Sequence, residues 1–223
     1  MVEPSIHIIG QSRINPGELK KFLASIGAEK FKSDATSDAT QLVEVAGRVC
    51  YMSYEKPRPG GNKTYLKHLM EVKHFSVIEH VTWNLAITNV SRALTAELTR
   101  HRVGVAISQL STRYVDCSKS TFYTPKIIKN HENLCKLYES AFRAAATVYK
   151  DTISILEKSF NLEKMKDDDK RKMQKIIRQA ARYVLPLATE TKLIWTINAR
   201  AARHFILLRA SRHAEVEIRK FAN

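Results

Sequence analysis

The sequence contains few cysteines, and their spacing forms no recognised pattern. Cys50, Cys117 and Cys135 lie far apart, and no CxxC pair occurs. This spacing indicates neither a zinc knuckle nor a disulfide framework, and it favours the reducing cytoplasm. Asp116 precedes Cys117 and is expected to raise the pKa of its thiol, while Cys50 lies in an expected apolar helix. Nucleophilic thiol catalysis is therefore not indicated.

Other common signals are absent as well. The chain has no GxGxxG motif, so a dinucleotide would not be held as it is in a Rossmann fold. It has no apolar run of about eighteen residues and no basic leader with a cleavage site, which argues against membrane spanning and secretion. The stretch GGNKT, residues 60–64, has Asn where a phosphate loop has Gly, and we interpret it as a plain turn.

A metal site is also not predicted. His74 and His80 flank Glu79 in the segment HFSVIEH. Helical zinc pairs place their histidines at positions i and i+4, whereas these two are six positions apart. The two histidines are therefore expected to pack and cap at a helix end.

Positive charge is what the sequence has in excess. Its 223 residues carry a formal net charge of +15, and 44% of them are hydrophobic. This length and apolar content are sufficient for a buried core, and we expect one domain over residues 1–223. The charge favours polyanionic partners, yet it does not distinguish nucleic acid from small phosphorylated molecules.

Hydrophobic spacing and cap residues predict a chain of both strands and helices. Asn15 is expected to cap a helix that begins at Pro16 and stops at Gly27, and Ser91 is expected to cap another. Pro186 should end the second of the two long helices expected between residues 130 and 182. The expected strands cover residues 5–9, 81–90 and 191–199, and the expected helices cover residues 16–27, 40–53, 65–75, 92–102 and 198–221, with two long helices between 130 and 182 that separate near KDDDK.

Two of the expected helices would present charge on one face. Glu97, Arg100 and His101 stand at positions i, i+3 and i+4 of the helix at 92–102. The C-terminal helix would have a similar cationic face and an i, i+4 ion pair, with Arg209, Arg212 and His213 on the face and Glu215 and Arg219 in the pair.

Lysine is absent from two cationic segments, residues 100–116 and 200–219, in which arginine and histidine lie among apolar and small residues. Arginine offers a planar fork of donors for phosphate and carboxylate oxygens, and it keeps its charge when partly desolvated. A surface for RNA typically combines lysines with exposed aromatic rings, and Tyr114 is the only aromatic residue in the first segment. The composition thus favours a pocket for anionic groups over an RNA-binding surface.

The segment RHRVGVAISQLSTRY, from Arg100 to Tyr114, resembles the signature of the flavin-dependent thymidylate synthases, the ThyX family. Four further segments agree with this family in order: GRVCYMS, KHFSVIEH, ARYVLPLATET and NARAARHFILLRASRHAEVEI. The resemblance covers most of the chain from about Val43 onward.

This resemblance implies a fold and an activity. The fold would be α/β (α+β), with a central mixed sheet flanked by long helices, in a homotetramer whose active sites are shared between subunits. The activity would be the reductive methylation of dUMP to dTMP, with methylenetetrahydrofolate as the carbon donor, FAD as the hydride carrier and NADPH as the reductant. No cysteine attacks the uracil in this family, which agrees with the unactivated cysteines of this chain.

The resemblance also implies roles for individual residues. Arg209 would be catalytic, with its fixed charge against the uracil to favour ionisation at N3, and His74 would lie on the folate side. The cofactor-binding residues would be Ser76, Arg100, His101, Arg102, Gln109, Asn198, Arg200 and His204. The substrate-binding residues would be Glu97, Arg100, Gln109, Ser111, Thr112, Arg113, Arg182 and Arg209.

The sequence departs from the family pattern at three places. Eight residues separate the RHR triplet from Ser111, one more than is usual, Glu97 stands where glutamine is usual, and Cys50 replaces a serine. Glu97 would place a carboxylate near an anionic substrate unless a cation pairs with it, and Cys50 would be the poorer hydrogen-bond donor. Two alternatives stay open: a basic RNA-binding protein on the same fold, and a flavin-binding relative with altered activity.

Overall fold

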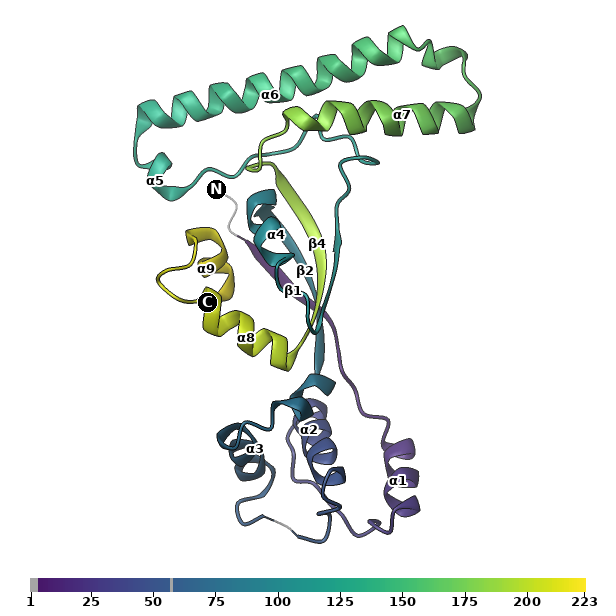
Figure 1. Cartoon of the computed structure of the whole chain (residues 1–223), viewed down its shortest axis with the longest axis vertical. Helices are drawn as coiled ribbons and strands as arrows, with labels where there is room; N and C mark the ends of the chain where they lie inside the picture. Colours follow the sequence, from purple (N-terminus) through teal and green to yellow (C-terminus); the bar gives the residue numbers. More distant parts are fainter. Residues whose placement is uncertain (1–3, 57) are drawn as a thin grey trace.

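The computed structural model describes residues 4–56 and 58–223, and its strands form one sheet. The strands β1 (Ser5–Gln11), β2 (Thr82–Ser91), β3 (Val105–Gln109) and β4 (Glu190–Asn198) lie in the order β1-β2-β4-β3. The chain is an α/β protein as predicted, but the expectation of a mixed sheet is wrong, because each pair of neighbouring strands is antiparallel. The helical segments after β1 and after β3 bring the chain back to the end of the sheet that it left, so the next strand runs the opposite way, whereas the segment that contains α4 crosses the sheet and β3 runs in the same direction as β2 (Figure 1).

One face of this sheet is covered by helices. In β4 the burial alternates, so that Leu193, Trp195 and Ile197 are buried while Ile194 on the opposite face is 38% exposed. This alternation is typical of an antiparallel sheet with one covered face. The covering helices are α4 (Arg92–Leu98), α8 (Ala199–Arg209) and α9 (Val216–Ala222), which lie on the same side of the sheet in Figure 1.

The core between the sheet and these helices is apolar and continuous. Leu94 and Leu98 of α4, Phe205 of α8, and Ile218 and Phe221 of α9 are buried together with the β4 side chains. Because these three helices share one core, a shift of one of them is transmitted to the others.

A second group of helices lies at one end of the molecule (Figure 1). It contains α1 (Pro16–Ser25), α2 (Asp38–Val49), α3 (Gly61–Glu71) and the short 3₁₀ helix η1 (Phe75–His80). Asn15 caps α1 by accepting the backbone N–H of Glu18, as predicted, and Gly27 adopts a φ of 71° just beyond the helix. The GGNKT segment is the start of α3 rather than an isolated turn.

The two long helices form a hairpin at the other end of the molecule, instead of flanking the sheet (Figure 1). The hairpin contains α5 (Lys126–Lys129), α6 (Glu132–Ser159), η2 (Leu162–Lys164), α7 (Asp167–Ala181) and η3 (Arg182–Val184). α7 begins inside the KDDDK run, where three aspartates in its first turn complement the positive end of the helix dipole. Within residues 4–56 and 58–223, no helix combines the length and the apolar character needed to cross a bilayer.

Three local predictions are wrong. α4 ends at Leu98, so Arg100 and His101 lie in the following turn and do not share a helix face with Glu97. The segment between the RHR triplet and Ser111 contains the strand β3, which was not predicted. The C-terminal helix is broken into α8 and α9, and the break has two consequences. It places Arg212 and His213 in a turn, and the Glu215 carboxylate caps α9 by accepting the backbone N–H groups of Glu217 and Ile218.

Candidate active site

Arg209, at the end of α8, contacts the last turn of α4 and the segment that follows it, which are distant from α8 in the sequence. Its Nη1–H donates to Oε2 of Glu97 at 2.9 Å, and its Nε–H donates to Nε2 of His101 at 3.0 Å. The side chains of Arg209 and Glu97 are 25% and 33% exposed, so the pair lies at the edge of the core and within reach of a ligand. Arg209 is therefore the cation that pairs with the unusual Glu97.

The surroundings of His101 favour its neutral form. Burial lowers the pKa of His101, and the positive charge of Arg209 and the neighbouring His204 lower it further. The hydrogen bond from Arg209 needs an unprotonated Nε2, which agrees with this direction. The ring of His101 also contacts Phe205 edge-on, with 5.1 Å between the ring centroids.

A cavity of about 440 Å³ opens at the start of α8. It collects three of the predicted cofactor-binding residues, Asn198, Arg200 and His204. The rings of His204 and His101 lie 6.3 Å apart, which connects this cavity to the Arg209 cluster. The remaining lining residues are Phe75, Glu79, Val103, Ala201 and Arg203.

Two charged residues of the cavity were not predicted as site residues. Arg203 lies over the ring of Phe75, at 4.4 Å from the centroid, and Glu79 accepts a hydrogen bond from Nη1 of Arg200. Arg203 could have been found from its spacing, because it stands at i+3 from Arg200 and thus on the same side of α8. Glu79 could not, since its partner is 121 residues away.

Asn198 is fixed in this cavity by backbone contacts. Its side-chain oxygen accepts the N–H of Ala201 and caps α8, and its own N–H donates to the carbonyl of Gly104. A Cβ at Gly104 would lie 2.5 Å from the Asn198 amide, and Gly104 has a φ of 72°. Only glycine fits this close approach without strain.

The predicted substrate residues Ser111, Thr112 and Arg113 lie in the turn after β3. Oγ of Ser111 accepts the backbone N–H of Arg113, and Thr112 is buried. Nε of Arg113 is buried and has no hydrogen-bond partner among residues 4–56 and 58–223. A buried donor of this kind needs an acceptor, which an anionic ligand could supply.

Arg182 lies in η3, at the end of α7, and its charge acts on Arg92, which contacts Leu110 just before this turn. Burial lowers the pKa of Arg92, and the nearby charge of Arg182 lowers it further. Arg92 was not predicted as a site residue, and its Nη1 donates to the carbonyl of Leu110. Two neighbouring arginines repel each other unless an anion binds between them.

Gln109 is oriented into the protein. Its amide nitrogen donates to Oγ1 of Thr95 at 3.0 Å and to Oγ1 of Thr191 at 3.1 Å. These hydrogen bonds fix Gln109 between α4 and β4. β3 covers five residues, so the Asn198 cavity and the Ser111 turn lie at opposite ends of a strand of about 13 Å.

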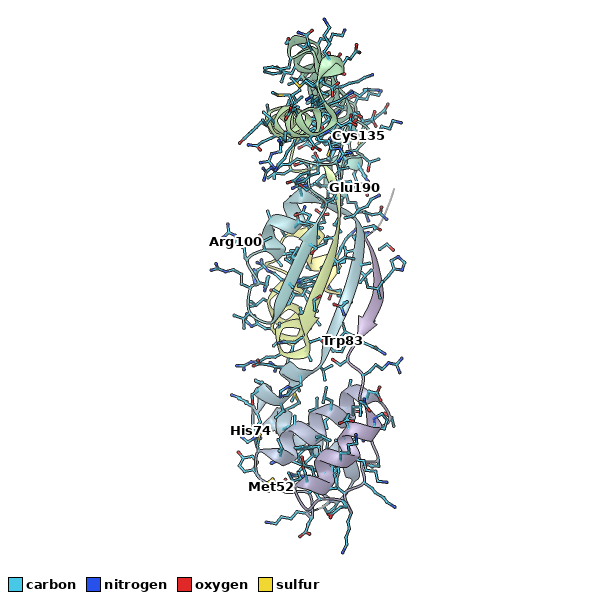
Figure 2. All side chains as sticks on the ribbon, turned by 90° about the vertical axis from the view of Figure 1, so that its right-hand side faces the viewer. Met52, His74, Trp83, Arg100, Cys135 and Glu190 are labelled. Carbon is cyan, nitrogen blue, oxygen red and sulfur yellow. The ribbon has the colours of Figure 1, made fainter. Side chains whose placement is uncertain are left out.

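The remaining predicted residues are exposed. His74 and Ser76 lie at η1, and the ring of His74 stacks on Tyr51 with 6.2 Å between centroids. Arg100 and Arg102 are exposed in the turn after α4. Figure 2 shows that His74 and Arg100 lie at different levels along the long axis, so the structure does not bring them together within one chain.

The cysteines have no activating surroundings. All three are free, and burial raises the pKa of Cys117, with a further contribution from the negative charge of Asp116. Sγ of Cys50 donates to the carbonyl of Ala46 at the exposed end of α2. Among the described residues, no group of three or more potential ligands could hold a metal ion.

Comparison with known proteins identifies the family. The family model described as thymidylate synthase complementing protein matches residues 33–223. A flavin-dependent thymidylate synthase from Mycobacterium sp. (strain JLS) is 43% identical over 194 residues, which are 86% of this chain and 76% of that protein. Another, from Mycobacterium tuberculosis (strain ATCC 25177 / H37Ra), is 44% identical over 183 residues, which are 81% of this chain and 71% of that protein. The chain therefore belongs to the thymidylate synthase complementing protein family, that is, to the flavin-dependent thymidylate synthases that its motifs resemble.

Proposed function

We propose that this protein catalyses the reductive methylation of dUMP to dTMP, with FAD as the hydride carrier, methylenetetrahydrofolate as the carbon donor and NADPH as the reductant. One observation carries this proposal: the family match over residues 33–223 includes every predicted site residue, from His74 to Arg209. The arginine-rich composition of the site supports it independently, because each of these reactants carries phosphate or carboxylate groups.

The residues around the α8 cavity are chemically suited to FAD. Arg200 and Arg203 would offset the charge of a pyrophosphate, with Glu79 balancing part of the charge of Arg200, and the Asn198 amide and the His204 imidazole can hydrogen-bond the edge of the isoalloxazine ring. The exposed Arg100 and Arg102 and the hydroxyl of Ser76 would complete the set, together with His101 and Gln109. When bound, the reduced flavin supplies the hydride that the methylation requires.

The dUMP phosphate would bind at the Ser111 turn. The buried Nε of Arg113 is a donor in need of an acceptor, and the hydroxyls of Ser111 and Thr112 and the guanidinium of Arg182 add further donors. Charge-assisted hydrogen bonds from arginine to phosphate are stronger than neutral ones. Glu97 and Arg100 would contact the nucleoside, and Gln109 would do so through its amide oxygen, because its amide nitrogen donates to Thr95 and Thr191.

Arg209 would act on the uracil. Its guanidinium is fixed by Glu97 and His101, so its charge needs no reorganisation when negative charge develops at N3. His101 remains neutral and accepts from Arg209, so it does not add a second positive charge. His74, which stacks on Tyr51, would contact the folate.

We also propose an oligomeric state and a cellular location for the protein. Tyr183 and Leu187, beside the proposed phosphate site, are 81% and 65% exposed, and exposed apolar residues at a site favour coverage by another subunit. We propose a homotetramer with shared active sites, built from one domain over residues 1–223. The free cysteines favour the cytoplasm.

A tritium-release assay tests the reaction. Protein supplied with [5-³H]dUMP, FAD, NADPH and methylenetetrahydrofolate is expected to release tritium and to form dTMP. Omitting the folate should stop dTMP formation. If the complete mixture gives no dTMP although the protein retains flavin, the protein is instead a flavin-binding relative with altered activity.

A further inference from the structure

Glu217, on α9, is a buried carboxylate that has no part in the reaction described above. The residue is 3% exposed. Its Oε1 accepts the backbone N–H of Ser91 at 2.8 Å, and its Oε2 accepts the side-chain O–H of Ser91 at 2.5 Å. Burying a carboxylate is unfavourable unless it is hydrogen-bonded. Both oxygens of Glu217 therefore depend on one serine that lies 126 residues away in the sequence.

Ser91 is the N-cap of α4, and Glu217 orients its hydroxyl. Oγ of Ser91 accepts the backbone N–H of Leu94 at 3.0 Å. A hydroxyl has one hydrogen and two lone pairs, and Glu217 takes the hydrogen, so that a lone pair faces Leu94. Glu217 thus fixes the first turn of α4 in two ways, through the serine backbone and through the cap.

The other end of α4 carries the partners of Arg209. α4 has 7 residues and is too short to be stable without tertiary contacts, so its position is set by its anchors. Glu97 lies in its last turn and His101 follows it, and both bind Arg209. Burial raises the pKa of Glu217, and the negative charges of Glu215 and Glu97 raise it further.

We propose that Glu217 is a positioning residue for the reaction: by anchoring the start of α4, it sets the position of Glu97 and His101 and thereby the direction in which the Arg209 guanidinium points. The inference rests on the proposed role of Arg209. It gives a function to the contact between α9 and the α4 cap, and neither Glu217 nor Ser91 is among the residues proposed to bind the ligands.

The test compares Glu217→Gln with Glu215→Gln in the FAD-loaded protein. Both carboxylates accept backbone N–H groups: Glu217 accepts the one of Ser91 at the start of α4, and Glu215 accepts those of Glu217 and Ile218 in α9. A displacement of a catalytic group by about 1 Å can cost about a hundredfold in rate, so Glu217→Gln is expected to lower kcat by about tenfold to a hundredfold. Its KM for dUMP should change less, and Glu215→Gln should keep the parent kcat.

A second readout does not depend on turnover. Arg209 contributes to the lowered pKa of His101, so a displaced α4 should let that pKa rise in Glu217→Gln when it is followed by NMR. A loss of folded protein alone would not change the pKa of His101 in the molecules that stay folded. This readout also separates the role of Glu217 from the role of Arg209. If Arg209→Ala kept full turnover, the catalytic role of Arg209 would be wrong, but the pKa of His101 would still test whether Glu217 positions α4.

The expected outcomes are specific. Parent values of kcat and of the His101 pKa in Glu217→Gln would overturn the proposal, and so would an equal loss of kcat in Glu215→Gln. If Glu217→Gln does not fold, Ser91→Ala replaces it, because this variant removes the O–H that donates to Oε2 and keeps the backbone contact. It is expected to show the same two changes to a smaller extent, and parent behaviour would again overturn the anchor.

Discussion

Two arginine–glutamate pairs in this protein have the same chemistry and different surroundings. Arg48 and Glu44 are both in α2, and Nη2 of Arg48 lies 2.7 Å from Oε1 of Glu44. Their side chains are 4% and 3% exposed. Nη1 of Arg48 donates to the carbonyls of Ser53 and Lys56. Glu44 accepts further hydrogen bonds from Ser33 and Asn62. Arg209 and Glu97, in contrast, are about one quarter and one third exposed, and the ring of His101, which accepts from Arg209, lies 6.3 Å from His204 in the wall of a cavity.

The difference separates a structural pair from a functional one. The Arg48 pair is enclosed and its groups are bonded to several segments, so it holds α2, α3 and the neighbouring loops together. Among the described residues, Arg209 makes two side-chain hydrogen bonds, to Glu97 and to His101, and the pair remains accessible, which leaves its charge available to a ligand. Full hydrogen-bonding in the core favours stability, whereas a fixed and accessible charge favours catalysis.

The largest effect is expected when the structural pair is broken. Arg48→Ala leaves Glu44 buried without its cation, which should lower the free energy of unfolding by about 3 to 5 kcal/mol. Urea unfolding followed by circular dichroism measures this loss. Arg209→Ala, at the accessible pair, should cost no more than about 1 kcal/mol. Equal losses in the two variants would remove the distinction between the pairs.

Activity should respond in the opposite way. Arg209→Ala removes a fixed charge from the reacting uracil and should lower kcat by about a hundredfold to a thousandfold. The control is Arg212→Ala, because Arg212 is an exposed arginine of the adjacent turn. The tritium-release assay compares the two. Full turnover by Arg209→Ala would exclude the catalytic role.

A smaller effect is expected at the phosphate site. Arg113→Ala removes a charged donor and should weaken dUMP binding by about tenfold to a hundredfold, because a hydrogen bond to a charged group contributes about 1.5 to 3 kcal/mol. Isothermal titration with dUMP measures the change. Arg143→Ala, on the exposed surface of α6, is the matched control and should bind as the parent does. Unchanged binding in Arg113→Ala would place the phosphate elsewhere.

The smallest effect concerns the titration of His101. Burial and the charges of Arg209 and His204 lower its pKa in the folded state, so the unfolded chain takes up this proton first as the pH falls. The contribution of His101 to stability is therefore lost as the pH falls below about 6.5, the usual value for histidine. In Arg209→Gln the pKa of His101 should rise toward that value in NMR titrations. A pKa that stays at the parent value would show that Arg209 does not act on His101.

Local rules predicted the elements whose signals are local. The cap at Asn15, Pro16 and the left-handed Gly27 delimit α1 as the sequence indicated, and β2 and β4 follow from their alternation. β3 was missed because it is a short edge strand whose order comes from pairing with β4. The helix predicted at 92–102 was too long for the same reason. β3 begins at Val105, so α4 ends at Leu98 to leave room for the turn that leads into the strand.

The site was predicted as a set of residues but not as a geometry. The motifs identified Arg209, Glu97 and His101, yet the contacts between them join residues 112 and 108 positions apart. The antiparallel order of the sheet places the end of α4 beside α8, and no sequence spacing contains this information. Glu217 and Glu79 escaped prediction for the same reason, since each has a partner more than a hundred residues away.

The proposed function requires the flavin and dUMP to lie against each other, with the flavin at the Asn198 cavity and the dUMP phosphate at the Ser111 turn. The most direct measurement is an absorbance spectrum of the purified protein after it has been equilibrated with FAD and freed of the excess, recorded before and after dUMP is added. We expect retained flavin bands that shift on adding dUMP, because the two ligands would lie against each other. A colourless protein, or flavin bands that do not respond to saturating dUMP, would contradict the account.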